Sequence, residues 1–333
     1  MQSVLIVGGG GMIGQRIARR LDAQGLAGRT VDRLTLFDRA FPAGAAGTAD
    51  RIAGDVGNPA MAARLAQLRP DTVFHLAAVV SADAEANFTK GWGVNLHAMW
   101  TLLEAFRLEH LASGRLYRPR LVFASSIAVY GPPFDGPVTD RDICEPRTSY
   151  GAQKRASELL LCDFSRKGYV DGLSLRLPTV TVRPGKPNAA ASSCFSSIIR
   201  EPLANRTAAL PISTSVRHAH ASPRRAAGFF AHAATLDTSS LDERRALNMP
   251  SVSCTVEEQI ETLRSVAGNG AVACIAKRPD PFIQRIVAGW PERIEAERAA
   301  ALGFEADRSF REIVQAYIED DFLPAEAETE DQT

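Results

Sequence analysis

The sequence predicts an α/β protein built on a doubly wound parallel sheet, with a smaller C-terminal lobe. Residues 4–7 form an uninterrupted apolar run, which is typical of a strand buried on both faces. A glycine-rich turn follows at once and leads into an amphipathic helix over residues 13–22. Further apolar runs then alternate with helical patterns as far as residue 177. This alternation predicts parallel strands joined by right-handed crossovers.

The remaining strands of the sheet can be placed in chain order. They are expected over residues 33–37, 51–56, 72–76, 120–124 and 173–177. Asn58 and Pro59 suit the cap and first residue of a helix, and longer helices are predicted over 95–110 and 150–167. After Pro178 the alternation stops, and short amphipathic helices are expected over 256–266, 282–287 and 310–318. We therefore predict a nucleotide-binding domain over 1–177, a mixed α/β substrate lobe over 178–323 and a disordered acidic tail over 324–333.

Composition limits the classes of partner. Lys+Arg and Asp+Glu both number 38 in 333 residues, so no net charge points to nucleic acid or to a membrane surface. No apolar run approaches membrane length, and the first one lacks a basic leader, so we expect a soluble cytoplasmic protein. Five cysteines without a Cys-x-x-Cys pair suit reduced thiols. His218 and His220 lack a nearby third ligand, so no metal site is predicted.

The glycine turn predicts a dinucleotide site. Gly8, Gly11 and Gly14 lie between a strand and a helix, where glycines allow a tight turn and close approach of a pyrophosphate. Asp38 ends the second strand, where a carboxylate can accept hydrogen bonds from ribose hydroxyls and would repel a 2′-phosphate. Arg39 follows it and could hold that phosphate, but the acidic residue favours NAD over NADP.

Three side chains predict proton transfer at an alcohol carbon. Tyr150 and Lys154 are four residues apart and share one helix face. A nearby ammonium favours the phenolate and so lowers the tyrosine pKa from its usual value of about 10. Ser126 arrives from the end of the fifth strand and can hydrogen-bond the same substrate oxygen. This set requires a hydride acceptor, which bound NAD would provide.

Together these motifs resemble the extended short-chain dehydrogenase/reductase family. The resemblance rests on the three glycines, Asp38, Asp55-Val56, Leu76-Ala77-Ala78, Ser125-Ser126 with Val129-Tyr130-Gly131, and Tyr150-x-x-x-Lys154. It implies a Rossmann domain, Tyr150 as the base, Lys154 lowering its pKa, and Ser126 as the hydroxyl partner. It also implies a homodimer formed through a four-helix contact. The implied cofactor contacts are Gly8, Gly11, Met12, Ile13, Gly14, Asp38, Asp55, Val56, Leu76, Ala77, Ala78, Asn95, Tyr150, Lys154 and Pro178.

The segment after the sixth strand bears on the substrate. Residues 176–192, 222–225, 290–291 and 302–304 resemble family members that use NAD to oxidise the C2 hydroxyl of a four-carbon sugar acid, D-erythronate. A substrate carboxylate suits a guanidinium partner, and Arg183 and Arg217 are both candidates. The predicted substrate-binding set is Ser81, Ser125, Ser126, Tyr150, Thr179, Arg183, Asn188 and Arg217.

Two other functions fit the same motifs. Most members of the extended family are nucleotide-sugar epimerases or dehydratases, so a 4-epimerase that retains its NAD is the first alternative. A non-catalytic NAD(P)-binding protein on the same fold is the second. The intact set of Ser126, Tyr150 and Lys154 argues against the second, since a binding protein has no need of all three.

Overall fold

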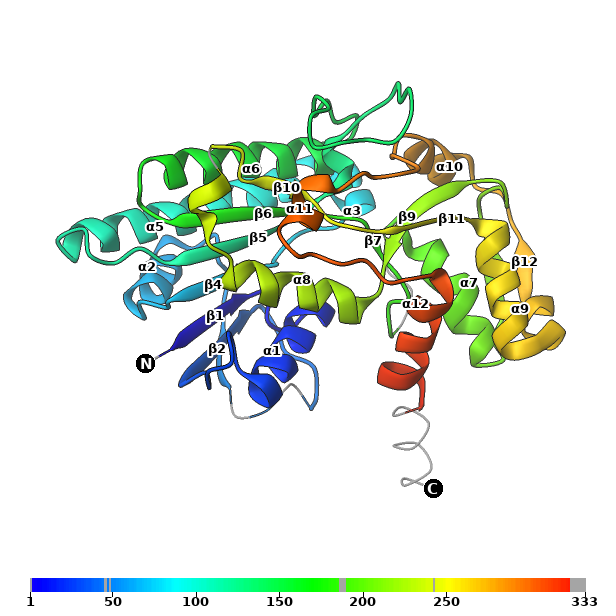
Figure 1. The fold of residues 1–333 in the computed structure, drawn as a ribbon, viewed down its shortest axis with the longest axis horizontal. Coiled ribbons are helices and arrows are strands. Elements are labelled where there is room, and N and C mark those ends of the chain that lie inside the picture. The colour runs from blue at the N-terminus through cyan, green and yellow to red at the C-terminus, as the bar shows by residue number, and fades with distance from the viewer. Residues whose placement is uncertain (1, 45–46, 48, 186–189, 242, 324–333) are drawn as a thin grey trace.

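A seven-stranded parallel sheet forms the centre of the molecule, with strand order β10-β6-β5-β4-β1-β2-β3 (Figure 1). The structure is a computed structural model and describes residues 2–44, 47, 49–185, 190–241 and 243–323. The strands are β1 (Ser3–Val7), β2 (Arg33–Asp38), β3 (Asp50–Ala53), β4 (Thr72–His75), β5 (Arg120–Ser126), β6 (Asp171–Leu177) and β10 (Ala246–Asn248). The chain order reverses between β1 and β4, and such switch points are where parallel sheets bind ligands.

Helices cover both faces of this sheet. Helices α1 (Met12–Gln24) and α8 (Pro223–Thr235) share one apolar core with it, to which α8 contributes the buried Phe229 and Phe230. On the other face lie α2 (Pro59–Gln67), α5 (Ala98–Ala112) and α6 (Ser149–Arg166). Shorter elements are α3 (Ser81–Ala86), α4 (Phe88–Trp92), the π-helical η1 (Gly93–His97), the 3₁₀ turn η2 (Ile127–Val129), η3 (Thr238–Leu241) and α11 (Glu297–Ala301).

The smaller lobe has a separate core. Its elements are β7 (Thr179–Val180), α7 (Ser193–Leu203), β8 (Ala208–Leu210), β9 (Arg217–Ala221), β11 (Val252–Thr255), α9 (Val256–Ala273), β12 (Ile275–Lys277), α10 (Pro281–Ala288), α12 (Phe310–Tyr317) and η4 (Ile318–Phe322). β9 lies between β7 and β11, and β8 pairs with β12. The predicted helix over 256–266 extends to Ala273 across Gly268, whose φ of 79° interrupts the helical backbone.

The two lobes are not consecutive along the chain. The sequence places everything from 178 to 323 in the smaller lobe, but α8 packs on the large sheet and β10 pairs with β6 at its edge. Helix α8 thereby covers the apolar face of β4 and β5, where Phe230 of α8 packs edge to face against Phe74 of β4. The predicted acidic tail, 324–333, lies outside the described residues. Within the described part of the chain, no helix is both long enough and apolar enough to cross a membrane.

Candidate active site

A cavity of about 440 Å³ opens at the carboxyl ends of β1, β4, β5 and β6, against the smaller lobe. The sheet side contributes the glycine turn, Leu76, Ala78, Ser125, Ser126, Tyr150 and Lys154. The smaller lobe contributes Arg183, Ser192, Arg200 and Trp290, among others. Of the predicted site residues, those lining it are Gly8, Gly11, Met12, Ile13, Gly14, Leu76, Ala78, Ser81, Ser125, Ser126, Tyr150, Lys154, Pro178, Thr179 and Arg183.

The glycine turn fits a dinucleotide because it leaves no room for side chains. Gly8 has a φ of +92°, and a Cβ there would lie 2.6 Å from the backbone nitrogen of Ala77. A Cβ on Gly14 would lie 2.4 Å from the carbonyl oxygen of Gly8. The first turn of α1 can therefore pack against β1 and direct free amides at a pyrophosphate. Ala77 thus acts through its backbone, packed beneath the turn.

Other predicted cofactor contacts occupy three further places. Asp38 lies beside the glycine turn, where its Oδ2 accepts a hydrogen bond from the Gly10 amide at 2.9 Å. Asp55 is exposed beyond β3 and accepts from the Gly57 amide at 2.9 Å, while Val56 is buried. Asn95 lies behind the cavity, where its amide bonds the backbone of Val79 at 2.8 and 3.1 Å. Asn95 thus holds the loop after β4 instead of lining the cavity.

Local packing brings Tyr150 to Ser126. Thr148 caps α6 through a 3.1 Å bond from the Gly151 amide. A Cβ on Gly151 would lie 2.1 Å from the carbonyl oxygen of Ala128, so this glycine allows the helix to reach the turn after β5. Ser126 and Tyr150 both line the cavity, and the Ser126 hydroxyl accepts a hydrogen bond from the Ala128 amide at 3.1 Å.

The electrostatics of Tyr150 differ from the sequence prediction. Burial raises the pKa of Tyr150 to about 12, while the positive charge of Arg183 and the Ser126 hydrogen bond act in the lowering direction. Lys154 is itself buried, which lowers its pKa to about 7. Its ammonium donates to the Ala124 carbonyl at 2.8 Å and lies 5.6 Å from the Tyr150 ring centroid. Arg183, which the sequence did not predict in this role, is therefore the cation whose charge lowers the Tyr150 pKa.

Arg183 is held by neutral groups. Its Nε donates to the Val180 carbonyl at 3.0 Å, and its Nη2 donates to the Ser192 hydroxyl at 2.6 Å. Its backbone amide donates to the Ser196 hydroxyl at 3.1 Å. Among the described residues, no carboxylate forms an ion pair with this largely enclosed guanidinium, and burial lowers its pKa.

Arg217 lies elsewhere. It is absent from the cavity lining, donates to the Ser253 carbonyl at 3.1 Å and lies 3.3 Å from the Glu258 carboxylate. The Ser125 hydroxyl donates to Glu158 at 2.5 Å, so its predicted substrate contact would have to replace that bond. Thr179 Oγ1 lies 2.7 Å from His218 Nε2. Asn188 lies outside the described residues.

Comparisons with known proteins agree with this geometry. Residues 4–218 match the model of the NAD dependent epimerase/dehydratase family. The chain belongs to this family. It is 44% identical over 96% of its length to D-erythronate dehydrogenase of Cupriavidus necator, covering 98% of that protein. The Haemophilus influenzae D-erythronate dehydrogenase is 38% identical, with 96% and 99% of the two chains covered.

Similar solved structures include one that is described as an epimerase. A crystal structure described as a nucleoside-diphosphate-sugar epimerase, from Agrobacterium tumefaciens, shares 48% identity at a TM-score of 0.90, covering 97% of this chain and 95% of that one. The holo L-threonine dehydrogenase of Cupriavidus necator shares the fold, at 23% identity and a TM-score of 0.81, with 96% and 99% covered. The family and its relatives show an NAD-dependent oxidoreductase of the extended short-chain dehydrogenase/reductase type.

Sequence reasoning missed the part of this family member's site that α7 supplies. Ser192, Ser196 and Arg200 follow one another at four-residue spacing, so they share a face of α7, of which Ser192 is the N-cap. Arg200 donates to the Arg183 carbonyl at 2.7 Å and pairs with Glu201 at 2.7 Å. This spacing is visible in the sequence and could have identified α7 as the support of Arg183.

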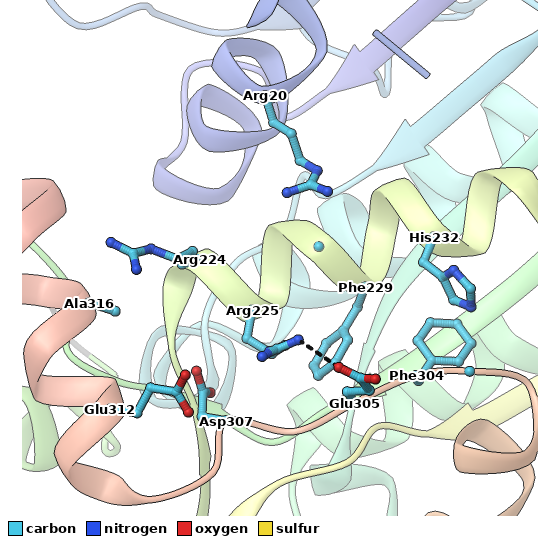
Figure 2. A pocket seen from close by; sticks show the side chains of 12 residues that line it. Arg20, Arg224, Arg225, Phe229, His232, Phe304, Glu305, Asp307, Glu312 and Ala316 are labelled. Carbon is cyan, nitrogen blue, oxygen red and sulfur yellow. Dashed lines mark ion pairs between the residues drawn. The ribbon is translucent and has the colours of Figure 1, made fainter. Parts of the chain in front are cut away.

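A second cavity, of about 320 Å³, lies between α1, α8 and the C-terminal segment (Figure 2). Arg20 reaches from α1 toward α8, and Arg225 faces Glu305 at 3.7 Å. Arg224 pairs with Glu319 and Asp320 at 2.8 and 2.5 Å. The Arg224 ion pairs connect α8 to η4, and the proton-transfer set lines the first cavity instead.

Proposed function

We propose that this protein oxidises the C2 hydroxyl of a small sugar acid, D-erythronate, to 2-oxo-tetronate (2-dehydro-D-erythronate) with NAD. The observation that carries the proposal is Arg183, a partly buried guanidinium that has no carboxylate partner among the described residues, in the cavity that also holds Ser126 and Tyr150. Two relatives that match nearly the whole chain are named D-erythronate dehydrogenase. The carboxylate of such a substrate would complete the charge balance of the site.

The argument for a carboxylate is energetic. A buried ion without a counter-ion is costly, because water no longer solvates it and neutral hydrogen bonds replace only part of that solvation. The Val180 carbonyl and Ser192 hydroxyl occupy one edge of the Arg183 guanidinium. A carboxylate can accept two parallel hydrogen bonds from a guanidinium, which a hydroxyl cannot. Arg183 therefore supports an anionic substrate better than Arg217, which Glu258 already neutralises.

The proposed chemistry assigns a role to each residue. The glycine turn and α1 would hold NAD, which supplies the hydride acceptor. Tyr150 accepts the C2 hydroxyl proton as the C2–H bond breaks, and the carbonyl forms at the same carbon. Ser126 orients the oxygen, and Lys154 and Arg183 supply positive charge that stabilises the tyrosinate form of Tyr150 before it takes up the proton. Arg183 binds the C1 carboxylate, which places C2 beside the phenol.

A second candidate has a specific observation in its favour. The 48% identical Agrobacterium tumefaciens structure is described as a nucleoside-diphosphate-sugar epimerase. Ser126, Tyr150 and Lys154 would serve proton transfer in that reaction too. It would require the smaller lobe to bind a diphosphate and a nucleobase, and it would produce no net NADH.

A substrate panel separates the two functions. Purified protein is mixed with NAD and either four- and five-carbon aldonic acids or nucleotide sugars, and NADH is followed by its absorbance. We expect NADH formation with D-erythronate and none with nucleotide sugars. Epimerised nucleotide sugar without NADH formation from any aldonate would overturn the proposal and support the epimerase.

A further inference from the structure

A buried carboxylate, Glu158, lies behind the proton-transfer set without lining the cavity. It is 3% exposed and follows Lys154 by four residues on α6, so the two side chains share a helix face. A carboxylate is rarely buried this deeply without a specific partner. Glu158 accepts four hydrogen bonds from three residues, and one of these residues, Ser125, is the neighbour of Ser126.

The contacts of Glu158 saturate both its oxygens. Oε1 accepts from the Ser125 hydroxyl at 2.5 Å and from Arg176 Nε at 2.9 Å. Oε2 accepts from Arg176 Nη2 at 2.9 Å and from Arg155 Nη1 at 3.0 Å. Ser125 precedes Ser126 at the end of β5, so the carboxylate ties α6 to the strand end that presents Ser126.

The negative charge of Glu158 also affects the protonation of Lys154. The Lys154 ammonium has one neutral acceptor, the Ala124 carbonyl, and lies 4.6 Å from the Phe123 ring centroid. Burial lowers the pKa of Lys154 to about 7, and Glu158 acts in the raising direction. From β4, His75 also faces this lysine, but burial lowers the His75 pKa to about 3, so it stays neutral. From α6 itself Tyr150 is the other titratable neighbour, and it is neutral until it gives up its proton.

We propose that Glu158 is a positioning residue of the reaction: it anchors the end of β5 beside Ser126, and it places a negative charge one helical turn from Lys154. The proposal rests on the proposed function for the part that Lys154 plays in proton transfer. It adds that the ammonium form of Lys154 depends on a carboxylate outside the cavity. Arg176 and Arg155 hold that carboxylate in place.

The network offers a matched control in Tyr130. Its hydroxyl accepts from Arg176 Nη1 at 2.6 Å and donates to Asn248 Oδ1 at 2.8 Å. Tyr130→Phe therefore breaks the same buried network but leaves the charges of Glu158 and Arg176 unchanged. A purely structural role of Glu158 predicts that both variants behave alike.

The direct test is the titration of Lys154 by NMR of the full chain with isotope-labelled lysine. The lysine signals come from Lys90, Lys154, Lys167, Lys186 and Lys277, and Lys154→Arg assigns the Lys154 signal. We expect Glu158→Gln to lower the Lys154 midpoint by about one pH unit or more. Tyr130→Phe should lower Tm and leave the midpoint within about 0.3 units. An unmoved midpoint in Glu158→Gln, or an equal shift in both variants, would overturn the proposal.

Kinetics give a second readout. Activity should fall as pH rises through the Lys154 titration, so Glu158→Gln should move this alkaline limb to lower pH by the same amount. Near pH 8, kcat should drop about tenfold or more while KM changes less than about threefold. If Glu158→Gln fails to fold, because Arg176 is left without its partner, Glu158→Gln/Arg176→Gln removes both charges and replaces it in the titration. A wild type without sugar-acid activity would contradict the proposed function, while the NMR titration still decides this proposal.

Discussion

The arginines on the two sides of the cavity differ in the groups that bind them. Behind the large-sheet wall, Arg176 is bound by both oxygens of Glu158, at 2.9 Å each. On the small-lobe wall, Arg183 is bound by a carbonyl and a hydroxyl. The first arrangement is complete within the protein and fixes the geometry of Ser126, Tyr150 and Lys154. The second contains no carboxylate among the described residues, and in the proposed function a substrate anion completes it. We therefore infer that the sheet supplies the chemistry and the smaller lobe the substrate specificity.

Removing the proton acceptor from the large-sheet side of the cavity should cause the largest loss of activity. Tyr150→Phe removes the proton acceptor but keeps the ring, so kcat should fall by about 10²–10⁴-fold. NAD affinity should stay within about threefold, because the glycine turn and Asp38 are unchanged. Steady-state NADH formation and NAD titration by fluorescence measure the two quantities. A variant that keeps a substantial part of its kcat would show that another group is the base.

The preference for NAD over NADP tests the role of Asp38, which lies outside both sides of the cavity. Asp38 binds the Gly10 amide and should favour NAD over NADP through repulsion of a 2′-phosphate. Asp38→Ala should narrow the ratio of kcat/KM values for the two cofactors by about tenfold or more, with Arg39 then free to pair with the phosphate. Equal use of both cofactors by the unmodified enzyme would show that Arg39 outweighs Asp38.

Acid should lower the folding stability of the protein through two histidines buried in the smaller lobe. Burial lowers the pKa of His218 to about 3 and that of His220 well below its ordinary value of 6.5. The unfolded chain therefore binds protons below about pH 6.5 that the folded protein refuses, so stability falls as pH drops from there toward about 3. Each histidine should contribute about 1.4 kcal/mol of lost stability per pH unit.

Urea unfolding at several pH values, compared with a His218→Gln variant, measures this contribution. The variant should show a shallower dependence of the unfolding free energy on pH, by about one histidine's share. An identical slope in both proteins would mean that His218 accepts a proton in the folded state.

Assembly is expected to leave both walls intact. Trp100 on α5 and Leu159 on α6 are 52% and 55% exposed, and α5 also bears Leu108 and Leu111 at the surface. We predict that these faces pair in a homodimer with twofold symmetry. Leu159→Arg should yield a monomer of about 36 kDa by light scattering. A wild-type protein that is already monomeric at micromolar concentration would contradict this prediction.

Local patterns explain why the sheet side was predictable. Gly8, Gly14 and the Tyr150–Lys154 spacing are set by a strand, a turn and one helix, each readable from a short stretch. The return of α8 and β10 to the large sheet depends on packing between distant segments, and the sequence prediction missed it. The same holds for the choice between Arg183 and Arg217. Glu258 is the residue that separates them, and no spacing rule relates it to Arg217.

We propose that Arg183 binds a substrate carboxylate, and a comparison of Arg183→Ala with Arg217→Ala on D-erythronate tests this most directly. The account predicts that Arg183→Ala lowers kcat/KM by more than about thirtyfold, because truncating one member of a desolvated charge pair costs about 2–5 kcal/mol. Arg183→Lys should recover part of this loss, since a point charge cannot match both carboxylate oxygens. Arg217→Ala should change kcat/KM by less than about threefold, and NAD affinity should be unaltered in all three variants. Full activity of Arg183→Ala on the acid, or a large loss in Arg217→Ala instead, would contradict the account.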